Sequence, residues 1–170
     1  MCNITLPTDE KKILQTIENC YKKYPITFTI FDHVGPFPTL IFPIKKLIQM
    51  SKKYNSISVV DGAHAIGQIP LNITDLDPDF YFSSCHKWLM SNKGTAFMYV
   101  NKKYQKYMHP TQITHWYKQG FKTEFRFIGT KDYTSLLSIK KSFEFRKWLS
   151  DEKIMKYNND LCSNVGKKKK

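Results

Sequence analysis

The sequence predicts an α/β fold with three α/β/α layers built around a mostly parallel sheet. Apolar runs of strand length alternate along the chain with segments whose apolar residues recur at helical spacing. That alternation favours parallel strands joined by right-handed crossovers. At 170 residues the chain is long enough for one domain with a real core, and its apolar content of 41% argues against wholesale disorder.

Three segments are typical of amphipathic helices. Residues 8–24 begin at Thr8, the expected N-cap, and carry acidic residues in the first turn and lysines in the last. Residues 44–55 repeat apolar side chains at the spacing of a surface helix. After a helix and a loop that start near Asn101, residues 132–149 form a third helical run.

Four apolar runs have the length of strands, and we expect the first of them to be buried. They cover residues 25–34, 56–63, 80–88 and 94–100, with a proline-punctuated loop at 35–43. Polar clusters follow the first three runs: Asp32 with His33, Asp61 with His64, and Ser83, Ser84, His86 and Lys87. The carboxyl ends of parallel strands form the ligand crevice in such sheets, so these clusters predict a functional site there.

The net charge of +13 raises the possibility of a nucleic-acid binder, because clustered basic residues release counterions from phosphates. Of the 27 basic residues, however, only Arg126 and Arg146 are arginines, and the lysines are spread along the chain. Arginine is the usual reader of base edges and phosphates. We therefore expect no specific nucleic-acid binding and treat residues 167–170 as a frayed lysine tail. A lysine-rich nucleic-acid binder remains the third interpretation.

The four cysteines, Cys2, Cys20, Cys85 and Cys162, show no CxxC pair and no metal-ligand spacing. This pattern argues against a zinc site and a disulfide framework, and it favours a reducing, cytoplasmic compartment. The sequence starts without a signal-peptide pattern and has no apolar run of membrane-spanning length. The N-x-T sequons at Asn3 and Asn72 are therefore interpreted as chance matches.

Asp61 and Lys87 are the residues most suggestive of chemistry. They lie about one strand-crossover-strand unit apart, so both can face one crevice. A desolvated lysine amine can attack a carbonyl to form a Schiff base, and an aspartate can face a protonated ring nitrogen. Together they are the two groups that a protein contributes to pyridoxal phosphate chemistry. Both residues also have a purely structural interpretation. In it, Lys87 points into solvent at the end of a strand, and Asp61 caps a helix that starts at 62–67.

The histidines are ambiguous. His64 could reach the same ligand as Asp61, but a lone histidine near a strand end is more often a satisfied core side chain, and the same holds for His33 and His115. No helical i, i+4 pair of histidines supports a metal site, so none is expected.

Three stretches resemble a known family. Residues 61–100 read "DGAHAIGQIPLNITDLDPDFYFSSCHKWLMSNKGTAFMYV", residues 32–47 "DHVGPFPTLIFPIKKL" and residues 114–133 "THWYKQGFKTEFRFIGTKDY". In this order they resemble the class V aminotransferase family of fold type I pyridoxal phosphate enzymes, in its branch of isopenicillin N epimerase-like and L-cysteine desulfhydrase-like proteins. The similarity runs from about residue 26 to residue 149.

The resemblance implies a role for each matching residue. Lys87 would hold pyridoxal 5'-phosphate as a Schiff base and move protons at the substrate alpha carbon. Asp61 would pair with the pyridinium nitrogen, and His64 would hydrogen-bond to the phenolic oxygen of the ring. Ser84 and His86 would contact the phosphate of the cofactor.

A second set of residues would act across subunits. Gly129 and Thr130 would reach the phosphate of the neighbouring subunit's cofactor, which implies a homodimer. The substrate would be an amino acid, with sulfur-containing ones among the candidates. Epimerisation, desulfhydration and transamination all use Asp61 and Lys87, so the reaction is left open.

The chain also departs from the family pattern. Gly35 and Pro36 stand where the branch has Thr-Ser, and Ser84 stands where close relatives often carry asparagine. Family members are longer, so residues 1–150 are expected to be an incomplete cofactor-binding large domain and residues 151–170 a truncated segment. The non-catalytic alternative is a truncated copy that is an interaction module or has no function. An exposed apolar sheet edge or association with a full-length homologue would favour it.

Overall fold

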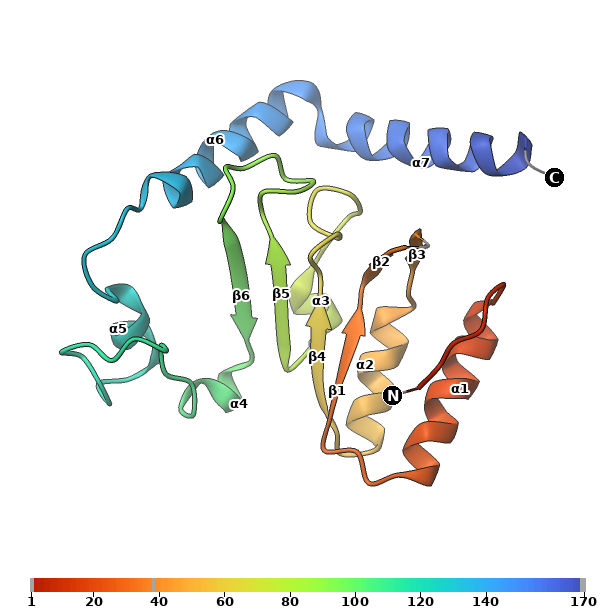
Figure 1. Cartoon of the computed structure of the whole chain (residues 1–170), viewed down its shortest axis with the longest axis horizontal. Coiled ribbons are helices and arrows are strands. Elements are labelled where there is room, and N and C mark those ends of the chain that lie inside the picture. Colours follow the sequence, from red (N-terminus) through yellow and green to blue (C-terminus); the bar gives the residue numbers. More distant parts are fainter. Residues whose placement is uncertain (1, 38, 169–170) are drawn as a thin grey trace.

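The computed structural model describes residues 2–37 and 39–168, and its centre is a four-stranded sheet in the order β1-β4-β5-β6 (Figure 1). The strands are β1 (Phe28–Asp32), β4 (Ile57–Asp61), β5 (Phe80–Ser84) and β6 (Ala96–Val100). β1, β4 and β5 run parallel to one another, whereas β6 is antiparallel to β5. The predicted α/β class and mostly parallel sheet are confirmed.

Helices cover one face of this sheet. α2 (Ile44–Lys53) packs on β1 and β4, and both α1 (Glu10–Lys23) and the short α3 (Ile73–Leu76) pack on α2. α1 starts one residue later than predicted, because the N-cap is Asp9, whose carboxylate accepts a hydrogen bond from the Lys12 backbone N–H at 2.8 Å.

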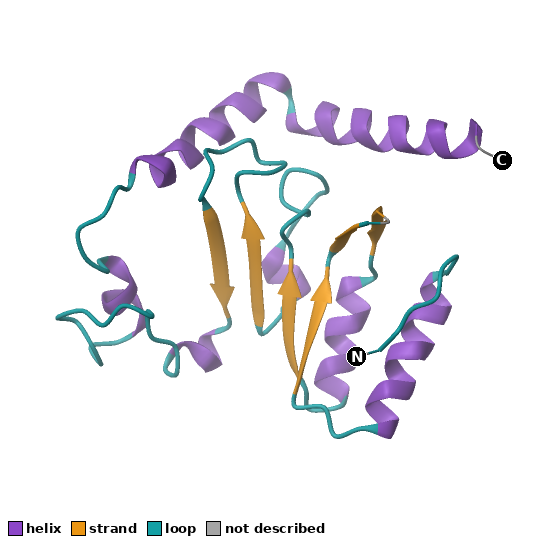
Figure 2. Ribbon diagram, viewed as in Figure 1, coloured by secondary structure: helices purple, strands orange, loops and turns teal. Residues whose placement is uncertain are grey.

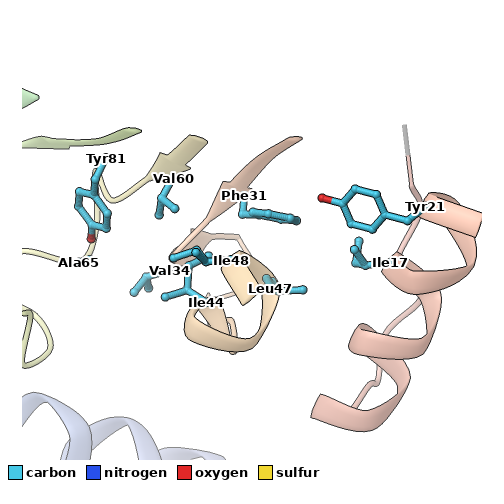
Figure 3. Close-up of a cluster of buried hydrophobic side chains, with 10 residues drawn as sticks. All are labelled: Ile17, Tyr21, Phe31, Val34, Ile44, Leu47, Ile48, Val60, Ala65 and Tyr81. Atoms are coloured by element: carbon cyan, nitrogen blue, oxygen red, sulfur yellow. The ribbon is translucent and has the colours of Figure 1, made fainter. Parts of the chain in front are cut away.

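The core lies between α2 and this face of the sheet. Ile44, Leu47 and Ile48 of α2 are at most 2% exposed and lie beneath Phe31 and Val60 of the strands (Figure 3). The apolar positions of residues 44–55 therefore form the helix face that the sequence pattern predicts.

The opposite face of the sheet is open. Phe28 and Ile30 of β1 are 58% and 59% exposed, and Met98 of β6 is 47% exposed. Successive strand residues point to opposite faces, so α2 can bury only every second residue of β1. The expectation that residues 25–34 form a buried strand is therefore wrong. Within the described residues α2 is the helix that packs along the sheet, so the third layer of the predicted α/β/α arrangement is not formed there.

The predicted loop at 35–43 contains a small hairpin. β2 (Val34–Pro36) and β3 (Thr39–Ile41) pair antiparallel. Each strand is only three residues long, and β2 contains Gly35 and Pro36, which explains why the sequence pattern indicates a loop.

The chain beyond β6 is mostly helical (Figure 2). It forms the short α4 (Lys102–Gln105) and α5 (Phe121–Arg126), then α6 (Thr134–Leu149) and α7 (Asp151–Lys168). α6 matches the predicted run, and α7 continues into the lysine run as far as Lys168. That residues 151–170 are a truncated segment of a longer protein stays a prediction. Lys169 and Lys170 lie outside the described residues.

Cys2 and Cys20 form a disulfide, although the cysteine spacing argues against a disulfide framework. Folding brings the segment before α1 back onto the helix, and sequence spacing does not record that contact. Because cytosolic thiols are kept reduced, the pair removes the cysteine argument for a cytoplasmic compartment. Cys85 and Cys162 are free. Among the described helices none is long and apolar enough to cross a membrane.

Candidate functional site

Two turns meet at the carboxyl ends of β4 and β5. In the first, the Asp61 carboxylate accepts a hydrogen bond from the Ala63 backbone N–H at 2.8 Å, which closes a turn rather than capping a helix. Gly62 is required there, because a Cβ atom at this position would lie 2.2 Å from the Tyr81 hydroxyl oxygen. The alternative interpretation of Asp61 as a helix cap is therefore wrong.

Lys87 lies in the second turn and contacts His64 in the first. Its Nζ is 3.0 Å from His64 Nε2, and the Trp88 indole N–H donates to His64 Nδ1 at 3.3 Å. A neutral imidazole has one N–H and one acceptor nitrogen. Because the indole N–H can only donate, Nδ1 is the acceptor, and the single N–H of the neutral His64 ring lies on Nε2, the nitrogen that faces Lys87.

His64 is held in its neutral form by its surroundings. Partial burial lowers its pKa, and the positive charge that Lys87 carries when protonated lowers it further. Trp88 was not among the residues expected at the site. Its position next to Lys87 is the one sequence signal that could have indicated it.

Asp61 has a second carboxylate beside it. Asp32 is its direct partner in the register of β1 and β4, so both side chains point to the open face of the sheet. Burial and then the negative charge of Asp61 raise the pKa of Asp32. The Asp61 Oδ2 atom accepts no hydrogen bond from the described residues. Two adjacent carboxylates of this kind favour a cationic ligand.

A buried polar cluster supports the first turn from the other face. His33 Nδ1 is 2.9 Å from the Tyr81 hydroxyl oxygen, and the His33 backbone N–H donates to the Asp61 carbonyl at 2.8 Å. Ser83 donates its hydroxyl to the Gly62 carbonyl. Burial lowers the pKa of His33 to about 4 and raises that of Tyr81. His33 is thus a satisfied core histidine, and the hydroxyls of Tyr81 and Ser83 in an otherwise apolar strand are the signals for this cluster.

Ser84 precedes the second turn and His86 belongs to it, but among the described residues no side-chain hydrogen bond joins either one to Asp61, His64 or Lys87. Ser84 ends β5 on the same face as Asp61 and is half-buried. His86 is exposed, and its Nδ1 is 3.1 Å from the Thr95 carbonyl oxygen. Lys87 is also exposed rather than enclosed in a dry crevice.

Gly129 and Thr130 are not brought to this cluster. They follow α5, where the Gly129 carbonyl accepts a hydrogen bond from the Tyr133 hydroxyl at 2.8 Å. Gly129 has a φ of 110°, which favours glycine. No hydrogen bond between described residues joins either one to Asp61 or Lys87, and their contact to a second subunit stays a prediction. The described residues also contain no cluster suited to a metal ion.

The comparisons with known proteins agree with this geometry. A family model described as "Aminotransferase class-V" matches residues 29–167. The chain belongs to the class V aminotransferase family. The resemblance seen in the three sequence stretches is thereby confirmed, and the matched range includes both turns and every residue expected to bind the cofactor.

The curated relatives that this class V aminotransferase family member matches by sequence include a lyase and a desulfhydrase. Hercynylcysteine sulfoxide lyase of Schizosaccharomyces pombe is 30% identical over 170 residues, which cover 94% of this chain and 43% of that protein. L-cysteine desulfhydrase of Arabidopsis thaliana is 30% identical over 145 residues, 83% of this chain and 32% of that protein. The chain therefore spans less than half the length of these relatives.

A solved structure confirms the fold. The cysteine desulfurase of Thermococcus onnurineus superposes with a TM-score of 0.74 at 20% identity, over 91% of this chain and 40% of that one. An identity this low shows a common architecture and nothing further about activity.

Proposed function

We propose that this class V aminotransferase family member is the central part of a pyridoxal phosphate-dependent enzyme that acts on an amino acid. One observation carries the proposal. Lys87 Nζ lies 3.0 Å from His64 Nε2 at the carboxyl ends of two parallel strands, beside the Asp61 carboxylate. A lysine amine that forms a Schiff base and a carboxylate that pairs with the ring nitrogen are the groups that pyridoxal phosphate enzymes supply.

The residues present fit the cofactor. Asp61 offers a carboxylate oxygen with no described hydrogen-bond partner, and Asp32 adds a second negative charge beside it. This pair suits the protonated nitrogen of a pyridine ring. Ser84 offers a hydroxyl near the same edge of the sheet, which suits a phosphate. The His86 Nδ1–H faces the Thr95 carbonyl, so the contact of His86 to the phosphate stays a prediction of the family resemblance.

Each of the site residues then has a defined task. When bound, pyridoxal phosphate supplies an electron sink for charge at the substrate alpha carbon. Lys87 supplies the amine that attaches the cofactor and a base for the proton at that carbon. Asp61 stabilises the positive ring nitrogen, and His64 keeps its Nε2 atom 3.0 Å from the Lys87 amine while Trp88 contacts its Nδ1 atom.

A sulfur-containing amino acid is the proposed substrate class. The names of two relatives, a hercynylcysteine sulfoxide lyase and an L-cysteine desulfhydrase, support this choice. Because the chain covers less than half of each relative, other segments are expected to contribute contacts to the substrate. Sulfide release from cysteine, measured on cofactor-loaded protein, tests the substrate separately from cofactor binding.

The deciding experiment is covalent trapping of the cofactor. Wild-type protein mixed with pyridoxal phosphate and then reduced with borohydride is expected to gain the mass of one cofactor, on the tryptic peptide that contains Lys87. Lys87→Ala should lose the adduct. Lys93→Ala is the matched control, because Lys93 is an exposed lysine of the same connection between β5 and β6. A folded wild-type protein with no adduct, or equal labelling of all three proteins, refutes the proposal.

A homodimer is part of the proposal. The expected positions of Gly129 and Thr130 at a neighbour's cofactor support it, since neither hydrogen-bonds to the Lys87 turn of its own chain. Sedimentation with and without pyridoxal phosphate tests it, and a cofactor-loaded monomer would contradict it. A cytoplasmic compartment stays a proposal, and the Cys2–Cys20 disulfide is the observation that argues against it.

The open sheet face favours a second candidate, an interaction module without catalysis. Phe28, Ile30 and Met98 expose apolar surface along this face. Parallel sheets are normally covered on both faces. Binding to a longer homologue without any adduct at Lys87 would favour this function over the first.

A further inference from the structure

Arg146 of α6 joins the two turns of the candidate site. Its guanidinium donates from Nη1 to the Trp88 carbonyl at 2.6 Å and from Nη2 to the Gly67 carbonyl at 2.7 Å. Its Nε donates to the Asp151 carboxylate at the start of α7. The side chain is only 2% exposed, although arginine is among the residue types that are almost never fully buried unless paired.

The two turns touch at the same place. A Cβ atom added to Gly67 would lie 2.6 Å from the Trp88 carbonyl oxygen, so the backbones approach as closely as a glycine allows. Gly67 also has a φ of 78°, which favours glycine independently. The planar guanidinium can hold two carbonyls at once, which a lysine ammonium cannot do with the same geometry.

The contact between Gly67 and Trp88 lies next to the residues that are proposed to bind the cofactor. Gly67 is in the turn that begins at Asp61 and carries His64, and Trp88 follows Lys87 in the other turn. The Lys87–His64 and Trp88–His64 contacts both cross from one turn to the other. A shift between the turns would therefore change the distance between the amine and the imidazole.

We propose that Arg146 is a positioning residue that holds the turn of Asp61 and His64 in register with the turn of Lys87. The inference deepens the proposed function and rests on it. Arg146 touches neither Lys87 nor His64, and it acts through the carbonyls of Gly67 and Trp88. A simpler role, in which Arg146 only anchors α6 and α7 to the domain, makes different predictions.

Three variants separate the two roles. Arg146→Lys keeps the charge but loses the two-carbonyl geometry. Asp151→Asn keeps both carbonyl contacts and weakens the link to α7. Lys147→Ala is the matched control, because Lys147 is the exposed neighbour of Arg146 on α6. Each protein is checked for folding by circular dichroism and urea unfolding before the site is probed.

Two readouts report on the site. The first is the apparent Kd for pyridoxal phosphate from an absorbance titration, which should rise roughly tenfold to a hundredfold in Arg146→Lys, the size of effect that a small misplacement of catalytic groups causes. The second is the ring nitrogen chemical shift of His64 by NMR without cofactor, assigned with His64→Gln. In Arg146→Lys this chemical shift should move toward the value of a free imidazole, in which the two tautomers are mixed. Asp151→Asn and Lys147→Ala should match wild type in both readouts.

The outcomes distinguish this inference from the proposed function. If wild type binds no cofactor, the proposed function fails, and the His64 shift in Arg146→Lys alone decides the inference. If wild type binds cofactor and Arg146→Lys equals Lys147→Ala in both readouts, the inference is overturned. It is also overturned if Asp151→Asn reproduces the Arg146→Lys effect, because α7 anchoring then explains both. Should Arg146→Lys fail to fold, Gly67→Ala takes its place, since its Cβ forces the same two turns apart.

Discussion

Acidification from about pH 7.5 toward pH 4 is expected to destabilise the fold through His33, a histidine held neutral in the core. Its side chain is 6% exposed, and its Nδ1 lies 2.9 Å from the Tyr81 hydroxyl oxygen. Burial lowers the pKa of His33 from 6.5 to about 4, because a charged imidazole would lose its hydration there. In the unfolded chain the same side chain accepts a proton at a higher pH.

The sign and size of the effect follow from this difference. Between pH 6.5 and about 4 the unfolded state binds more protons than the folded state, so the free energy of unfolding falls as the pH falls. One pKa unit corresponds to about 1.4 kcal/mol, so the loss attributable to His33 approaches about 3 kcal/mol near pH 4. A domain with roughly 5–15 kcal/mol of total stability loses a substantial share of it.

Urea unfolding of wild type and His33→Asn across this pH range measures the contribution. Asp32 has the opposite sign, because a raised carboxyl pKa adds stability as the pH falls, but it is present in both proteins and cancels in their difference. At about pH 7.5 His33→Asn should be the less stable protein by about 1–2 kcal/mol, since the hydrogen bond to Tyr81 is altered. Below about pH 5 the variant should equal or exceed wild type.

A difference between the two proteins that stays constant from pH 7.5 to pH 4 would refute the reasoning, because His33 would then titrate alike in both states. An NMR titration of the His33 ring in the folded protein provides the independent check. A folded-state pKa near 6.5 would contradict the structural argument even if the stability curves diverged.

Other predictions concern the rest of the fold. Asp79→Ala should lower the free energy of unfolding by about 3 kcal/mol, measured in urea, because the buried carboxylate accepts hydrogen bonds from the Ser58 backbone N–H and hydroxyl at 2.8 and 3.0 Å; a loss below about 1 kcal/mol would contradict this. Ile30→Thr should reduce binding of a hydrophobic dye while changing stability by less than about 1 kcal/mol, since Ile30 is 59% exposed on the open sheet face. Thiol labelling of the denatured chain should detect two cysteines before reduction and four after it, and four labels without reductant would exclude the Cys2–Cys20 disulfide.

Much of the fold was predictable because its signals are local. The apolar face of residues 44–55 and the apolar runs before Asp61 and Ser84 record burial directly, and α2, β4 and β5 lie where these patterns place them. The open face of β1 was not predictable in the same way. Phe28 and Ile30 are as apolar as core residues, and only the absence of a packing helix on that face of the sheet, within the described residues, leaves them exposed.

The residues of the candidate site fall into the same two groups, those with a local sequence signal and those without one. Asp61, His64 and Lys87 were predictable because they follow strands and match a family motif, and two of them are in contact. Trp88 and Arg146 were not predictable as part of the site, since each acts through a contact between segments that are distant in sequence.

The sequence by itself determined the family, the order of the long strands and helices up to α6, and the residue types at the strand ends. These depend on local patterns of apolar and polar residues that survive without neighbours. The tertiary structure decided which charges and carbonyls meet: the Asp32–Asp61 pair, the tautomer that Trp88 selects in His64, and the guanidinium that joins two turns. Such contacts depend on distances between segments far apart in the chain, and only packing fixes those distances.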